Sequence, residues 1–128
     1  MGKQFINPEP STYSSAAVEA QNIIFVGGQI PLDANGRIVG KSVETQAVQC
    51  FENLKAVLEA SGADLEDVVR LNIYAVIKKK DFQKEYQKIR EVRSRYFKKH
   101  FPAATGVIVE HLATKGVLVE IEAIAVKG

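Results

Sequence analysis

The chain has one cysteine and no tryptophan among its 128 residues, and no apolar run approaches the ~20 residues needed to span a bilayer. A single cysteine excludes an intrachain disulfide framework and favours a reducing compartment, and we interpret Cys50 as a buried core residue rather than a reactive thiol. The N-terminal residues also lack the apolar stretch, of about 7–15 residues, that marks a signal peptide. We therefore expect a cytoplasmic protein that does not engage a membrane.

An excess of charge of one sign is also lacking. Seventeen basic and fifteen acidic residues leave a formal net charge of +2, which gives no electrostatic case for nucleic acid binding. His100 and His111 lie far apart without ligand-spaced partners, and Gly27-Gly28 lacks the spacing of a dinucleotide fingerprint. Neither a metal site nor a nucleotide cofactor is predicted.

The length and a hydrophobic content of 46% are ordinary for a single soluble domain, spanning residues 1–128, with its own core. Ser42 is a candidate N-cap for a helix that closes at Ser61-Gly62, and a second helix is predicted from Asp81 to Phe101-Pro102. The predicted order is two strands, helix, strand, helix, two strands. This order favours an α+β fold in which one mixed sheet has both helices on one face. Strands are predicted near residues 23–26, 69–77, 105–110 and 117–126.

The last predicted strand alternates, and both of its faces are partly apolar. A sheet buried on both faces needs two covering layers, and the two helices supply only one. Self-association through the second face is the economical solution. One face carries Val117, Val119, Ile121, Ala123 and Ala125, and the other carries Leu118, Glu120, Glu122, Ile124 and Val126.

Two glutamates on that strand are candidates for chemistry. Glu120 and Glu122 lie on one face, roughly 6.5–7 Å apart along the backbone. A carboxylate between apolar neighbours is partly desolvated, which raises its pKa and suits it to proton transfer. Alternatively, one or both reach solvent or pair with Arg or Lys in a structural role. Tyr13, in a polar loop over residues 7–15, is either a loop anchor or a ligand contact.

Six sequence blocks follow one another along the chain: Tyr13-Ser14, Gly28-Gln29-Ile30-Pro31, Gln46-Ala47, Asn53-Leu54, Phe101-Pro102-Ala103 and Glu120-Ile121-Glu122-Ala123-Ile124-Ala125-Val126. Together they resemble the YjgF/RidA family over residues 3–127. The resemblance implies a chorismate-mutase-like α+β fold, with the second sheet face in the interior of a homotrimer that binds a small molecule in three inter-subunit clefts. It also implies hydrolysis of enamines and imines, such as 2-aminoacrylate, to a 2-keto acid and ammonia without a cofactor or metal.

The family's functional positions can be carried over residue by residue. The resemblance assigns Glu120 the role of positioning and activating water. The Gly28-Gln29 turn, and Tyr13 from the neighbouring subunit, would complete the cleft. The arginine that clamps the substrate carboxylate in active members is replaced here by Ala104, which would line the ligand site with Thr105.

Other departures accompany this replacement. Gly27 stands where a serine is frequent, Gly106 where a cysteine is frequent, and Glu85-Tyr86 in place of an asparagine. Losing the bidentate contact costs on the order of 2–5 kcal/mol, so the usual small imine should be handled poorly and a bulkier or uncharged ligand fits the enlarged cleft. A substitute cation could come from one of three arginines that the sequence does not distinguish: Arg37, Arg70 and Arg93.

Three functions follow as hypotheses. The first is a divergent deaminase of small imines with Glu120 as the base. The second is a non-catalytic trimeric module that binds a small metabolite or a partner protein. The third, RNA cleavage or translation inhibition, comes from older family names. It is disfavoured by the small net charge and by the lack of a paired His or His/Lys constellation.

Overall fold

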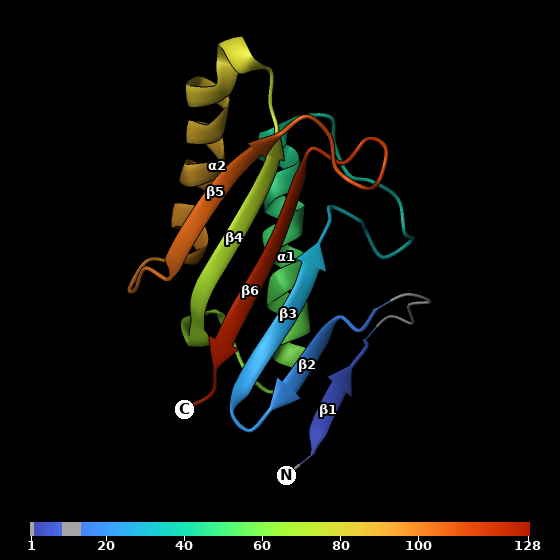
Figure 1. Ribbon diagram of the computed structural model, residues 1–128, viewed down its shortest axis with the longest axis vertical. Helices are drawn as coiled ribbons and strands as arrows, with labels where there is room; N and C mark the ends of the chain where they lie inside the picture. The colour runs from blue at the N-terminus through green and yellow to red at the C-terminus, as the bar shows by residue number, and fades with distance from the viewer. Residues whose placement is uncertain (1, 9–13) are drawn as a thin grey trace.

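The computed structural model describes residues 2–8 and 14–128. Six strands form a single sheet in the order β1-β2-β3-β6-β4-β5, and both helices lie on one side of it (Figure 1). The pairing of β4 with β5 is parallel and the other pairings are antiparallel, so the sheet is mixed. The elements are β1 (Lys3–Ile6), β2 (Ala17–Ala20), β3 (Ile23–Gln29), α1 (Val43–Ala60), β4 (Val68–Val76), α2 (Phe82–Tyr96), β5 (Ala103–Val109) and β6 (Val119–Val126), with short 3₁₀ turns at Leu65–Asp67 and Lys79–Asp81.

The α+β prediction of a mixed sheet with two helices on one face is confirmed, and two details of it are wrong. Three strands precede α1 rather than two, because β1 and β2 are only four residues long and give almost no alternation to detect. Helix α2 ends at Tyr96, before Phe101-Pro102. The chain leaves the helix at Phe97, whose backbone is no longer helical and whose ring is buried edge-on against Phe51. Burying this ring favours ending the helix early.

Helix α1 is held at its start by its cap and against the sheet by a buried glutamine. The Ser42 hydroxyl accepts the backbone N–H of Thr45, as the N-cap pattern predicts. Gln46 is fully buried, donates to the carbonyl of Gly116 at 2.9 Å, and accepts the N–H of Leu118 at 2.6 Å. Because a buried amide must be hydrogen-bonded, these contacts fix where β6 begins relative to α1.

Strand β6 runs through the middle of the sheet, and its two faces have different environments. Val119, Ile121 and Ala125 are buried against the helices, as the alternation predicts. Cys50 lies in the same core, with its thiol 3.3 Å from the carbonyl of Val119, and burial raises its pKa. The interpretation of this cysteine as a core residue is confirmed. Glu120 lies on the opposite face.

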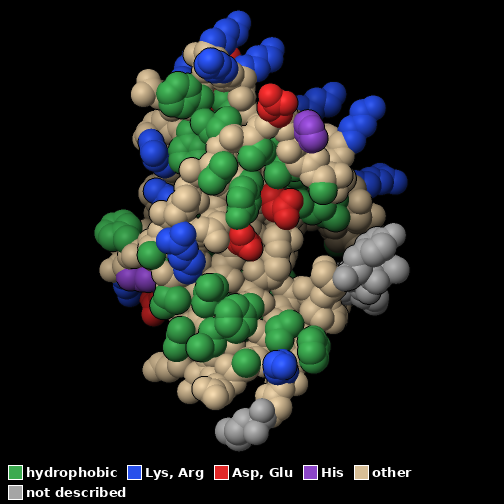
Figure 2. All heavy atoms as spheres, in the orientation of Figure 1, with side chains coloured by type: hydrophobic (Ala, Val, Ile, Leu, Met, Phe, Trp, Pro, Cys, Tyr) green, Lys and Arg blue, Asp and Glu red, His purple; other side chains and the backbone are tan. Residues whose placement is uncertain are grey.

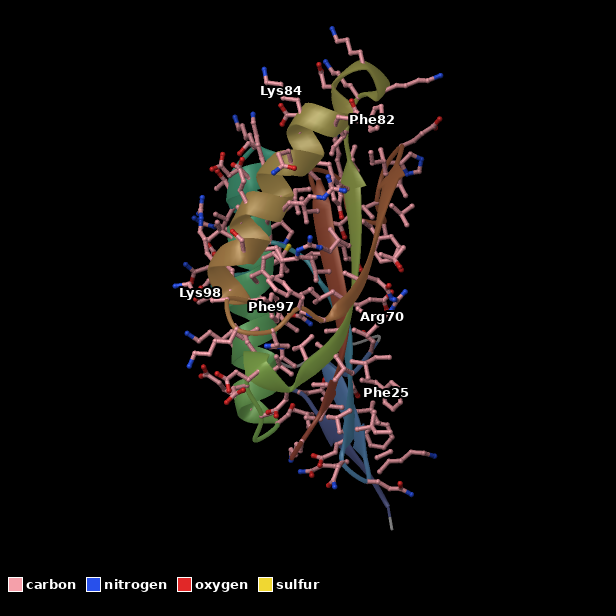
Figure 3. The ribbon with its side chains drawn as sticks, turned by 90° about the vertical axis from the view of Figure 1, so that its left-hand side faces the viewer. Phe25, Arg70, Phe82, Lys84, Phe97 and Lys98 are labelled. Carbon is pink, nitrogen blue, oxygen red and sulfur yellow. The ribbon has the colours of Figure 1, made fainter. Side chains whose placement is uncertain are left out.

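No element within residues 2–8 and 14–128 covers the second face of the sheet. In Figure 3 the labelled side chains Phe25 and Arg70 project away from the helices. Phe25 pairs with Ile124 on β6 and remains 48% exposed, and Phe5 is 64% exposed. Figure 2 shows apolar side chains gathered on the lower part of this face, with acidic side chains near its middle. We call this apolar group the open-face patch; it consists of Phe5, Ile23, Phe25, Ile124 and Val126. Within residues 2–8 and 14–128, neither helix is long and apolar enough to cross a bilayer.

Candidate functional site

Glu120 projects from the open face of the sheet and lies against Gly28. A Cβ atom built on Gly28 would overlap the carboxylate oxygen of Glu120 and lie only 2.9 Å from its Cδ atom. The pairing of β3 with β6 shifts register between Val26 and Gln29, which brings Gly28 against the glutamate. Only a glycine therefore leaves the carboxylate in this position.

The environment of Glu120 raises the pKa of its carboxyl group. Burial is the larger cause, and the nearby charge of Glu122 is the second. Glu120 makes no hydrogen bond with any residue that the structure describes. Glu122, in contrast, accepts the hydroxyl of Tyr74 at 2.6 Å and the amide of Asn72 at 3.4 Å. Glu122 thus has a structural partner, though not a cationic one, and Glu120 is the carboxylate left available to accept a proton.

The turn after β3 is fixed from the helix side. The Asn53 amide donates to the carbonyls of Ile30 and Leu32, both at 2.9 Å, and the Gln29 side chain donates to the Gly27 carbonyl at 3.0 Å. Gln29 also pairs with β6 immediately beside Glu120. We call Gly28, Gln29 and Glu120 the glutamate half-site. Tyr13, predicted to reach this cleft from a neighbouring subunit, lies outside the described residues.

Ala104 and Thr105 lie on β5, at the edge of the sheet, and face opposite sides. Thr105 is on the open face, where its hydroxyl accepts a hydrogen bond from Arg70 at 2.8 Å. Ala104 pairs with buried Leu71 and faces helix α2. Within one chain, Ala104 is thus separated from Glu120 by strand β4 and by the thickness of the sheet.

A cavity of about 450 Å³ lies between α2 and β5, over Ala104. The hydroxyl of Tyr86 occupies the space that a side chain at position 106 would take, so Gly106 is required by its neighbour. The sequence marks Ala104, Gly106 and Tyr86 as separate departures, and the structure places them together. We call this the arginine cavity; its lining residues are Phe82, Gln83, Tyr86, Arg90, Arg93, Ala104, Gly106 and Ile108.

Two of the residues that line this cavity are arginines, and each is a candidate to replace the missing cation at position 104. Arg93 is one of three arginines that the sequence offers as substitutes, and Arg90 is not among them. An arginine on an exposed helix face has no sequence feature that separates it from solvated surface. Arg70, a second candidate, is on the opposite face with Thr105, and Arg37 does not line this cavity.

Comparison with known proteins identifies the family. The sequence profile described as Endoribonuclease L-PSP matches residues 6–127. A RutC family protein of Pyrococcus horikoshii is 42% identical over 121 residues, covering 94% of this chain and 91% of the relative. A protein of Dermatophagoides farinae named 2-iminobutanoate/2-iminopropanoate deaminase is 37% identical over 120 residues, covering 93% and 89%.

A solved structure agrees with these sequence matches. A conserved Rid family protein of unknown function from Yersinia pestis superposes with a TM-score of 0.88 at 30% identity, over 98% of this chain and 100% of that one. The match covers the sheet, both helices and the two groups of residues described above. The chain therefore belongs to the YjgF/RidA/RutC family.

Proposed function

We propose that this protein hydrolyses small reactive enamines and imines to carbonyl compounds and ammonia, without a cofactor, in clefts between the subunits of a homotrimer. The observation that carries the proposal is Glu120, a half-buried carboxylate with a raised pKa and no hydrogen-bond partner among the described residues. A general base poised nearer neutral pH is more effective than an ordinary glutamate. The deaminase name of the Dermatophagoides farinae relative supports the same chemistry.

The proposed reaction has two stages. An enamine first tautomerises to its imine, and water then adds to the imine carbon while Glu120 accepts one proton from that water. A C–O bond forms and the C=N bond becomes a C–N single bond. Glu120 passes the water proton to the nitrogen, which gives the neutral carbinolamine. In the collapse Glu120 accepts the hydroxyl proton and delivers it to the nitrogen, the C–N bond breaks, and ammonia leaves as the carbonyl forms. One water is consumed, and no redox change occurs.

The site is proposed to be built from two copies of the chain. Within one chain, the glutamate half-site and the arginine cavity lie on opposite sides of the sheet. The open-face patch leaves large apolar side chains uncovered, which is typical of a surface that packs against a partner. Self-association would cover the patch and could bring the glutamate of one copy to the cavity of the next.

The test is a direct assay of imine loss. An amino-acid oxidase or a dehydratase generates 2-aminoacrylate and larger 2-imino acids, and their disappearance is followed with wild type, Glu120→Gln and Ala104→Arg. We expect the rate of imine loss with wild type to exceed the rate in buffer and Glu120→Gln to abolish this excess. Ala104→Arg should increase the rate of loss of the smallest substrate.

Two outcomes would count against the proposal. Activity of Glu120→Gln equal to that of wild type would remove Glu120 from the mechanism. If wild type never exceeds the buffer rate on any imine while Ala104→Arg does, the enzyme hypothesis fails for this substrate class. The non-catalytic binding module then takes its place.

A further inference from the structure

Arg90 and Arg93 lie on one face of helix α2 and line the same cavity as Ala104. Residues three and four apart on a helix are neighbours, so Tyr86, Arg90 and Arg93 form one continuous surface. The guanidinium of Arg90 sits 5.0 Å from the centre of the Tyr86 ring, a cation–π distance. The Tyr86 ring is itself buried and thus gives Arg90 a rigid support.

These two positive charges have no counter-ion within the described residues, 2–8 and 14–128. The ion pairs formed there involve other residues, including Arg95 on the same helix, which pairs with Glu44 at 3.7 Å. Burial raises the pKa of Tyr86, and the charges of Arg93 and Arg90 oppose that rise, so both act on the region of the phenol oxygen. The cavity therefore presents a positive potential that is not neutralised within the described residues.

Apart from Gln83 and the Tyr86 hydroxyl, the remaining walls of the cavity are apolar. Phe82 is 45% exposed and Ile108 is 39% exposed, so each presents part of its apolar side chain at the edge of the cavity. At Ala104 a methyl group replaces a long side chain, which leaves the space beside these walls open. A cavity of about 450 Å³ with two guanidinium groups and an apolar wall suits a ligand with one anionic end and one bulky apolar end.

We propose that Arg90 and Arg93 bind the substrate carboxylate from helix α2 in place of the arginine missing at Ala104, and that the substrates are 2-imino acids with bulky apolar side chains. The assignment of 2-imino acids as substrates rests on the proposed imine hydrolysis, whereas the binding of a carboxylate by the two arginines does not. The side chain of the substrate packs against Phe82 and Ile108. The protein is thus a carboxylate-recognising member of its family, with the cation moved from the strand to the helix.

The test is a binding measurement that needs no turnover. Calorimetric titrations use 4-methyl-2-oxopentanoate, which has the carboxylate and an apolar side chain, and its uncharged amide. The variants are Arg90→Gln, Arg93→Gln and the double change, with Arg95→Gln as the matched control on the same helix. A thermal melt of each variant checks its fold.

We expect wild type and Arg95→Gln to bind the carboxylate equally well and to prefer it to the amide. A hydrogen bond to a charged group contributes about 1.5–3 kcal/mol, so loss of one such contact weakens binding about 10- to 150-fold, and the double variant should lose at least this much affinity for the carboxylate. Its affinity for the amide should not change. Adding Ala104→Arg to the double variant should restore the preference for the carboxylate.

The inference is overturned if wild type binds no 2-oxo acid at millimolar concentration, or if the folded double variant binds it as tightly as wild type does. Should the double variant fail to fold, the two single variants decide, because each is expected to show part of the loss. If carboxylate binding depends on these arginines but no imine is hydrolysed, the inference stands and only the proposed function fails.

Discussion

Replacing Gly28 with alanine should disable the proposed base while leaving the fold intact. The new Cβ would overlap the carboxylate oxygen of Glu120 and lie 2.9 Å from its Cδ and 3.2 Å from its Cγ, whereas ordinary contact begins at 3.4 Å. The carboxylate must therefore move by roughly 1 Å. A displacement of this size can cost about 100-fold in rate, or about 2.7 kcal/mol in activation free energy.

The neighbouring glycine provides the control. A Cβ at Gly27 would meet the carbonyl of Ser15 at 3.3 Å and that of Ala16 at 3.5 Å, and Glu120 is not among its neighbours. We expect Gly27→Ala to retain most of the imine-loss activity and Gly28→Ala to lose about 99% of kcat/KM, with both variants melting cooperatively. Equal activity of the two variants would refute the assignment of Gly28 as the residue that makes room for the base.

Three further predictions follow from the same geometry. Changing Glu122 to Gln removes the negative charge that is the second cause of the raised pKa of Glu120, so that pKa should fall. The acid limb of the pH–rate profile, where activity is lost as Glu120 becomes protonated, should then move to lower pH, and an unmoved limb would argue against Glu120 as the titrating group. Random co-assembly of equal amounts of Glu120→Gln subunits and Arg90→Gln/Arg93→Gln subunits should give about a quarter of wild-type activity if each site takes its glutamate from one subunit and its arginines from another. No activity should be recovered if one subunit holds the whole site. Phe25→Lys places a charge in the open-face patch and should lower the sedimentation coefficient to that of a monomer, and a trimer that survives this change would mean that another surface holds it together.

Much of the fold could be predicted because it rests on local periodicity. The alternation along β6 gives both of its faces correctly, and Ser42 marks the start of α1. The end of α2 could not be predicted, because it depends on the burial of Phe97 against Phe51, a residue more than forty positions away. Periodicity describes a residue's neighbours along the chain and carries no information about partners that are distant in the sequence.

The candidate site shows the same division between local and long-range information. The desolvation of Glu120 follows from its apolar neighbours in sequence, but its contact with Gly28 depends on a register shift between two strands. The contact of Tyr86 with Gly106 joins a helix to an edge strand twenty residues later. Each is a pair of residues whose shapes fit one another, and neither member of a pair reveals the other from the sequence alone.

The position of strand β5 couples ligand binding to subunit association. Six of its seven residues are exposed, and it is an edge strand, so no other strand within residues 2–8 and 14–128 pairs with its outer backbone groups. An edge of this kind invites pairing with another chain. The same strand contributes Ala104 and Gly106 to the arginine cavity, so recognition of a ligand and contact with a partner fall on one segment. Ligand binding and subunit association are then thermodynamically linked: substrate should hold the assembly together at dilutions where the empty protein dissociates, and specific activity should fall as the protein is diluted without it.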